Sequence, residues 1–241
     1  SLAAAMLLAG CYEGDSSDLD AGSGTESGGL GDEGDGSDSD GETPELSCED
    51  GTPGPRSLRL LTRAEFAKTV SDLLGVPEPD TSTVPVEPSV EGYDNNAAAS
   101  FVTARHVEAY MDIARLAAGE AVDTDAAALA GCMPEDPACA RSFVETFGAR
   151  ALRRPLEDAE VEHYLGQFEG EAADGDFYEG MRMAIEAMML SPGFLYRSEM
   201  GESVGGGLYR LTPWETASLL SYTYTGSMPD PELMAAAADG E

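Results

Sequence analysis

The chain has 241 residues, with 46 acidic and 13 basic side chains and a formal net charge of −33 at pH 7. Nucleic-acid binding depends on cation-rich faces, and adsorption to anionic lipid needs clustered basic residues, so this balance argues against both. We therefore expect no nucleic-acid partner and no direct attachment to an anionic membrane surface through charge.

The first eleven residues, SLAAAMLLAGC, form an apolar run that ends in a cysteine. The ending Leu8-Ala9-Gly10-Cys11 is typical of a bacterial lipobox, in which a peptidase cuts before a cysteine that carries diacylglycerol. A truncated transmembrane helix or an accidental apolar terminus is the alternative, but ten residues are far fewer than the about 20 that span a hydrocarbon core. We expect residues 1–10 to be the remnant of a lipoprotein signal peptide and Cys11 to be the lipid-attachment site.

A segment of different composition follows. Residues 12–50 contain 14 acidic residues, no Lys or Arg, and mostly Gly and Ser otherwise. Such a segment buries too little apolar surface to offset the entropy of ordering its backbone. Residues 11–55 are therefore predicted to be the lipidated cysteine and a disordered acidic linker. We expect this linker to hold the folded domain away from the membrane; a solvated tail that spaces nothing is the alternative.

Helical periodicity dominates the remaining sequence. Thr62-Arg63-Ala64-Glu65 is a capping box that opens a helix, and Gly75 with Pro77 ends it. Only residues 207–211 alternate like a strand, so the predicted fold class is all-α: an irregular multi-helix bundle preceded by the linker. Further helices are expected near residues 103–122, 138–153, 158–168, 176–190, from 213 onward, and 231–238.

These elements suggest three helical segments. We predict a first helical domain over residues 56–123, a second over 124–203, and the start of a third over 204–241. The last helix is rich in alanine and is not followed by a closing element. The third domain is therefore expected to be truncated.

Three cysteines remain if Cys11 is lipidated. Cys132 and Cys139 frame the short loop GCMPEDPAC, and disulfides persist in exported proteins, so we predict a bridge between them. Free thiols or half of a zinc site are the alternatives, although zinc sites usually use closer cysteine pairs or histidines. Cys48 is left without an assigned partner. No Cys-x-x-Cys-His motif occurs, so nothing in this chain attaches a c-type haem.

Five segments, in order along the chain, resemble one group of proteins. The group is the tandem domains of unknown function from planctomycetes and myxobacteria that accompany cytochrome c domains, and the resemblance covers about residues 56–238. The segments are LRLLTRAEFAKTVSDLLG at 58–75, EGYDNN at 91–96, FGARALRRPL at 147–156, SPGFLYR at 191–197, and the run from YRL at 209–211 to GSMPD at 226–230.

The resemblance implies an exported, often lipid-anchored, helical protein with further C-terminal domains. It implies no known reaction, and whether the chain is an enzyme stays open. The haem-binding motif of some relatives is absent here, which puts a direct electron-transfer role for this chain in doubt.

Several polar residues could form sites. Asp94, Asn95 and Asn96 could ligate calcium or hold a sugar hydroxyl, but a simple turn is favoured because Asn and Asp satisfy local amides. His106 could be a general base, and His163 could share a carboxylate–histidine metal site with Glu160. No nucleophile or second ligand is identified for His106, so a surface or half-buried role is favoured. The second carboxylate–histidine pair that a di-metal bundle requires is missing, so His163 is expected on a solvated helix face, and no resident metal or cofactor is expected.

Other candidates have equally plain explanations. Arg153 and Arg154 could pair with carboxylates or bind an anion, although positive charge at a helix C-terminus is favourable in itself. Aromatic residues near the C-terminal end could build a sugar or partner platform, or belong to the core. They are Phe194, Tyr196, Tyr209, Trp214, Tyr222 and Tyr224.

These observations predict a membrane-anchored surface lipoprotein of the cell envelope, attached to the outer membrane or cell surface and facing the periplasm or the exterior. Its helical module would work with cytochrome c or substrate-handling partners. The alternative is the N-terminal part of an exported oxidative or hydrolytic enzyme that acts on extracellular polymers, with site residues in missing domains.

Overall fold

The computed structural model describes residues 54–90, 92, 96–97, 101–170 and 175–240. Cys11, Cys48, Asp94, Asn95 and the acidic linker up to residue 53 lie outside these residues. The chain divides into two units, Ser1–Pro55 and Arg56–Glu241, and the second contains all the elements described below.

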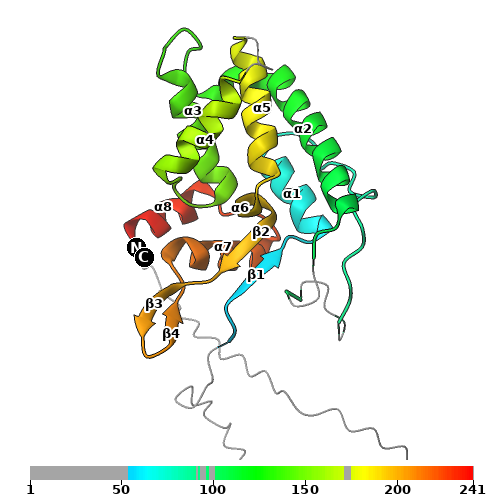
Figure 1. The fold of residues 1–241 in the computed structure, drawn as a ribbon, viewed down its shortest axis with the longest axis vertical. Coiled ribbons are helices and arrows are strands. Elements are labelled where there is room, and N and C mark those ends of the chain that lie inside the picture. The colour runs from blue at the N-terminus through cyan, green and yellow to red at the C-terminus, as the bar shows by residue number, and fades with distance from the viewer. Residues whose placement is uncertain (1–53, 91, 93–95, 98–100, 171–174, 241) are drawn as a thin grey trace, which may run out of the picture. The chain divides into compact units, whose positions relative to one another are not determined.

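The described part of the second unit is mostly helical, as predicted, and contains eight helices with four short strands. The helices follow one another with short connections, except between α1 and α2 and between α6 and α7, where three of the strands lie (Figure 1). They are α1 Arg63–Leu74, α2 Ala104–Ala130, α3 Cys139–Leu152, α4 Asp158–Phe168, α5 Phe177–Met189, α6 Pro192–Leu195, α7 Pro213–Thr225 and α8 Pro231–Asp239.

Local sequence sets the helix ends. The predicted capping box of α1 is present: the Thr62 hydroxyl accepts from the Glu65 amide, and the Glu65 carboxylate accepts from the Thr62 amide. Gly75 ends this helix in a left-handed conformation with φ of 71°, which glycine adopts without a steric penalty. The other predicted helices are found at their predicted positions, and α2 continues to Ala130 rather than stopping near residue 122.

The core is centred on α5, which packs against α2, α3 and α4 (Figure 1). Its inward side chains Met181, Ile185, Met188 and Met189 are completely buried, as the amphipathic pattern predicted. Each such side chain contributes roughly 1.5–3 kcal/mol on burial. The same hydrophobic cluster continues through all three predicted helical segments, from α1 through α5 to Tyr222 on α7.

Two short antiparallel ladders add β structure that the all-α prediction omitted, so that prediction is met only in its coarser, mostly helical form. β1 (Ser57–Leu60) pairs with β2 (Tyr196–Glu199), and β3 (Glu202–Gly205) pairs with β4 (Leu208–Arg210). The first ladder joins segments about 140 residues apart, so local periodicity carries no signal for it. β4 lies in the one alternating run of the sequence, and its hairpin partner completes the sheet.

A disulfide closes the corner between α2 and α3. Cys132 and Cys139 are bonded, with their Cα atoms 5.6 Å apart, which confirms the predicted bridge and excludes free thiols and a zinc pair at these two positions. None of the described helices is both long enough and apolar enough to be a membrane span.

Candidate functional site

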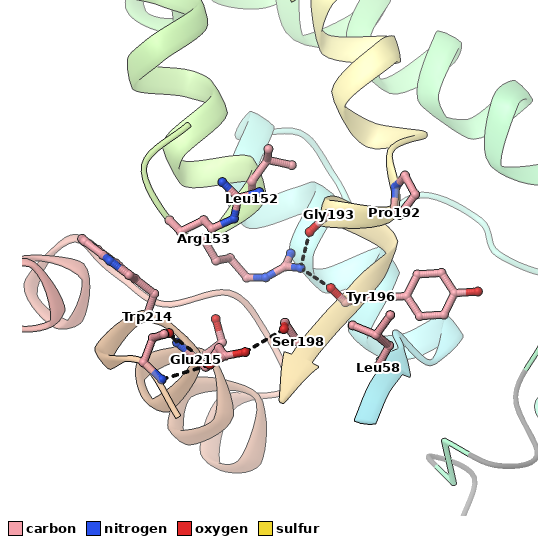
Figure 2. Close-up of a pocket in the computed structure, with 12 residues that line it drawn as sticks. Leu58, Leu152, Arg153, Pro192, Gly193, Tyr196, Ser198, Trp214 and Glu215 are labelled. Atoms are coloured by element: carbon pink, nitrogen blue, oxygen red, sulfur yellow. Dashed lines mark hydrogen bonds between the residues drawn. The ribbon is translucent and has the colours of Figure 1, made fainter. Parts of the chain in front are cut away.

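A pocket of about 350 Å³ opens where α3 ends, the α6–β2 turn passes and α7 begins (Figure 2). Its apolar wall comes from Leu58 on β1, Leu152 on α3, Pro192 on α6 and Tyr196 on β2. Its polar side chains come from the end of α3, from Ser198 on β2, from the N-cap Thr212 and from α7. The pocket therefore gathers residues from all three predicted helical segments.

Arg153 is the buried centre of this pocket wall. It ends α3 with φ of 59°, and no other described non-glycine residue has a positive φ. Its guanidinium donates 2.8 Å hydrogen bonds to the carbonyls of Gly193 and Tyr196 and a 3.2 Å bond to that of Phe194 (Figure 2). The left-handed backbone of a non-glycine residue costs roughly 1–2 kcal/mol, whereas each hydrogen bond from a charged group contributes about 1.5–3 kcal/mol. The hydrogen bonds of Arg153 therefore outweigh the cost of its left-handed backbone.

Tyr222 joins Arg153 to a second buried arginine behind the pocket. The ring of Tyr222 lies 5.7 Å from the guanidinium carbon of Arg153 and 5.0 Å from that of Arg197. Its hydroxyl is 2.9 Å from the Thr69 hydroxyl on α1. The Arg197 guanidinium lies 3.7 Å from the Glu65 carboxylate, which supplies the opposite charge that a buried cation requires. This cluster ties α1, α3, β2 and α7 together.

Glu215 is the carboxylate of the pocket, and protein donors already occupy it. One oxygen accepts from the Ser198 hydroxyl at 2.7 Å and from the Met200 amide at 2.9 Å; the other accepts from the Thr212 amide and hydroxyl at 2.9 and 3.1 Å. Burial raises the pKa of Glu215, but these hydrogen bonds and one from the Gly201 amide together hold it below its usual value. Glu215 is therefore ionised and serves as an anchor between β2 and α7, which makes it a poor general base.

Arg154, at the edge of the pocket, forms a two-pronged ion pair with Glu160 on α4. The two nitrogen–oxygen distances are 2.8 and 2.7 Å. The hydrogen bond from Arg154 lowers the pKa of Glu160, while the same bond raises the pKa of Arg154. The two arginines therefore have different roles: Arg153 donates to backbone carbonyls, whereas Arg154 pairs with a carboxylate, as one of the sequence-based alternatives proposed.

The structure describes only some of the predicted site residues. Asp94 and Asn95 fall outside the described residues, and the half-buried Asn96 stays untested as a ligand. His106 caps α2, because its Nδ1 accepts from the Thr103 amide at 3.2 Å. His163 is exposed on α4, and Glu160 turns to Arg154 instead. Among the described residues, no group of three or more metal-ligating side chains lies together.

The C-terminal aromatic residues divide between core and surface. Phe194 and Tyr222 are buried, so the core interpretation holds for them. Trp214 and Tyr196 line the pocket. Tyr209 is half exposed and lies under the Arg56 guanidinium, 3.8 Å from its ring centre, and Tyr224 is largely exposed.

Sequence reasoning singled out Arg153 and Arg154 but missed the other polar residues of the pocket, Glu215 and Ser218 among them. Glu215 follows Thr212 by three residues, and this T-x-x-E capping box is a readable signal for the start of α7. Its second role, accepting from Ser198, Met200 and Gly201, depends on a tertiary contact that no local pattern carries. The pocket-lining Ser218 has no sequence signal at all.

Comparison with known families accounts for most of the second unit. Residues 59–123 match a family model described as protein of unknown function (DUF1587), residues 139–199 match one described as DUF1595, and residues 211–241 match one described as DUF1592. No curated protein and no solved structure matches the chain. The predicted tandem arrangement is confirmed: the chain carries three domains of unknown function in the order DUF1587, DUF1595 and DUF1592.

Proposed function

We propose that this chain is an exported lipoprotein of the cell envelope whose helical unit is a recognition module rather than a complete enzyme. Cys11 carries the lipid, residues 12–50 form an acidic spacer, and the unit from residue 56 onward engages a cytochrome c or a substrate-handling partner. The pocket beside Arg153 is the recognition site of this module.

The observation that carries the export half of this proposal is the bridge between Cys132 and Cys139. Disulfides form and persist outside the cytoplasm and are rare inside it. The lipobox-like sequence ending in Cys11 points independently to the same compartment. The acidic composition adds a physical requirement for a covalent anchor, because a strongly anionic chain is repelled by anionic headgroups.

The recognition half is supported by the chemistry of the pocket. Its carboxylate, Glu215, is saturated by protein donors, and its buried cation, Arg153, donates to backbone carbonyls. Groups held in this way position the walls of a cavity and are ill suited to move protons. A rigid, partly apolar cavity with a few polar groups is the usual form of a binding site.

Metabolic labelling with palmitate tests the anchor. In cells that express the gene, the wild-type protein should incorporate the label and sediment with membranes, and Cys11→Ser should abolish both. Cys48→Ser is the matched control, because it removes a cysteine outside the lipobox and should leave labelling unchanged. Labelling that persists in Cys11→Ser, or wild-type protein found only in the cytosol, would overturn the proposal.

A further inference from the structure

Ser218 on α7 lines the pocket with a hydroxyl that has no partner among the described residues. The residue is 6% exposed, lines the pocket, and makes no side-chain hydrogen bond to any described residue. Its neighbours behave differently: the hydroxyls of Thr216, Thr223 and Thr225 all donate to the carbonyl four residues earlier, at 3.0, 2.7 and 2.8 Å. Because this hydroxyl faces the pocket and no described residue bonds to it, it is available to a ligand atom there.

Arg153 supplies a second open donor. Both terminal nitrogens of its guanidinium bond to protein acceptors, whereas its Nε–H makes no hydrogen bond to any described residue. In Figure 2 the side chain crosses from the end of α3 toward Gly193 and Tyr196 along the pocket. The carbonyl bonds fix the guanidinium, so the remaining donor is preorganised for an acceptor oxygen.

An aromatic face borders these donors. Trp214 lines the pocket from the first turn of α7 and is partly exposed, and its indole nitrogen makes no hydrogen bond to any described residue. Leu152, Pro192 and Leu58 provide the remaining apolar contacts. A ligand that fills this cavity needs an apolar face for the indole and oxygen atoms at its rim for the donors.

The charges of the pocket balance. Arg154 is neutralised by Glu160, and Arg153 shares the pocket with the ionised Glu215. Outside residues 12–50 the chain carries 32 acidic and 13 basic residues, so its long-range field repels anions. The pocket therefore has no surplus positive charge with which to bind an anionic ligand.

These observations point to one ligand class. We propose that the pocket binds a neutral sugar ring of an oligosaccharide, with the C–H face of the ring against Trp214 and a ring or hydroxyl oxygen accepting from Arg153 Nε–H and Ser218. A volume of about 350 Å³ lies at the lower end of the roughly 300–1,000 Å³ of small-molecule sites, which suits one ring more than a long chain. The inference rests on the recognition role of the pocket and does not depend on lipid attachment.

Trp214 is the single tryptophan of the chain, so its fluorescence reports this pocket alone. The purified 241-residue chain is titrated with cellobiose, maltose and xylobiose as neutral probes and with sodium acetate as an anionic probe. At least one disaccharide should change the emission saturably in the millimolar range, while acetate should not. A saturable response to acetate but to no disaccharide, or no response to any probe, would overturn the proposal.

Two serine variants on α7 test the contact itself. Ser218→Ala should weaken disaccharide binding by about 2- to 10-fold, the effect of losing one ordinary hydrogen bond. Ser221→Ala is the matched control, because Ser221 is equally buried on the same helix but lies outside the pocket and near Thr225. Equal weakening in both variants would reject the pocket as the binding site. Because the test uses purified protein, a failure here is distinct from a failure of palmitate labelling.

Discussion

At the scale of single residues, the polar side chains of this protein mostly serve its backbone. Arg153 satisfies the carbonyls of the α6–β2 turn, Glu215 satisfies the amides of Met200, Gly201 and Thr212, and His106 satisfies the amide of Thr103. Each of these side chains gives a hydrogen-bond partner to a buried or helix-terminal backbone group that would otherwise need water. Their removal should therefore affect stability before it affects binding.

His106 gives this protein a pH-dependent helix cap. Burial lowers its pKa from the usual 6.5, against a smaller opposite effect of the Glu87 carboxylate, and the cap uses the unprotonated Nδ1 as acceptor. A lowered pKa means that the unfolded chain binds the proton more tightly, so the stabilisation is complete above about pH 6.5 and is lost as the pH falls through the folded-state pKa. The wild-type melting temperature should fall more between about pH 7 and pH 5 than that of His106→Gln, which keeps an acceptor.

His163→Gln is the control for that measurement. His163 is exposed on α4 and takes no part in a cap. Its variant should follow the wild-type pH dependence. If His106→Gln and the wild type lose stability in parallel on acidification, His106 is not a titrating cap.

At the scale of elements, close helix packing depends on glycine in one place and not in another. A Cβ atom at Gly180 on α5 would lie 2.5 Å from the Phe168 carbonyl oxygen of α4, whereas one at Gly166 on α4 would meet nothing within 4 Å. Gly180→Ala should destabilise the protein by about 1–3 kcal/mol through overpacking. Gly166→Ala should stabilise it by about 0.5–1 kcal/mol, because alanine is the better helix former.

Urea denaturation followed by circular dichroism measures both variants. Opposite shifts of the unfolding midpoint at an unchanged slope are expected. If Gly180→Ala is neutral, α4 and α5 do not pack as closely as their backbone positions require.

The helices were predictable because their signals are local. Capping residues, apolar spacing and terminal glycines lie within a few residues of one another, and they located α1, α3 and α5 closely. The β1–β2 ladder and the pocket were not predictable, because their partners are distant in sequence. Arg153 shows the difference well: it was recognised as positive charge at a helix end, but its carbonyl partners lie about 40 residues further on.

At the scale of the whole molecule, the three domains of unknown function share one hydrophobic cluster. Tyr222 on α7 belongs to the same cluster as α1 and α5, and its hydroxyl contacts Thr69. Separate sequence families are therefore assembled here into one folded unit from residue 56 onward. Such a shared core favours unfolding in a single step.

Unfolding in urea tests this shared core. Trp214 fluorescence reports α7, and far-ultraviolet circular dichroism reports all the helices. The two signals should give the same midpoint in the wild-type protein, because α7 cannot leave without exposing the cluster around Tyr222. An earlier fluorescence transition would show that α7 and α8 unfold as a separate unit.

The β1–β2 ladder also defines how this unit responds to mechanical load. β1 directly follows the acidic segment in sequence, and its first residue, Ser57, is paired with Glu199. A force applied along that segment loads the contact of Arg56 with the Met200 carbonyl first and this pair next. Leu58 comes next and is also a wall of the pocket. A force applied at this end of the unit would therefore loosen one wall of the pocket before it reaches the helical core.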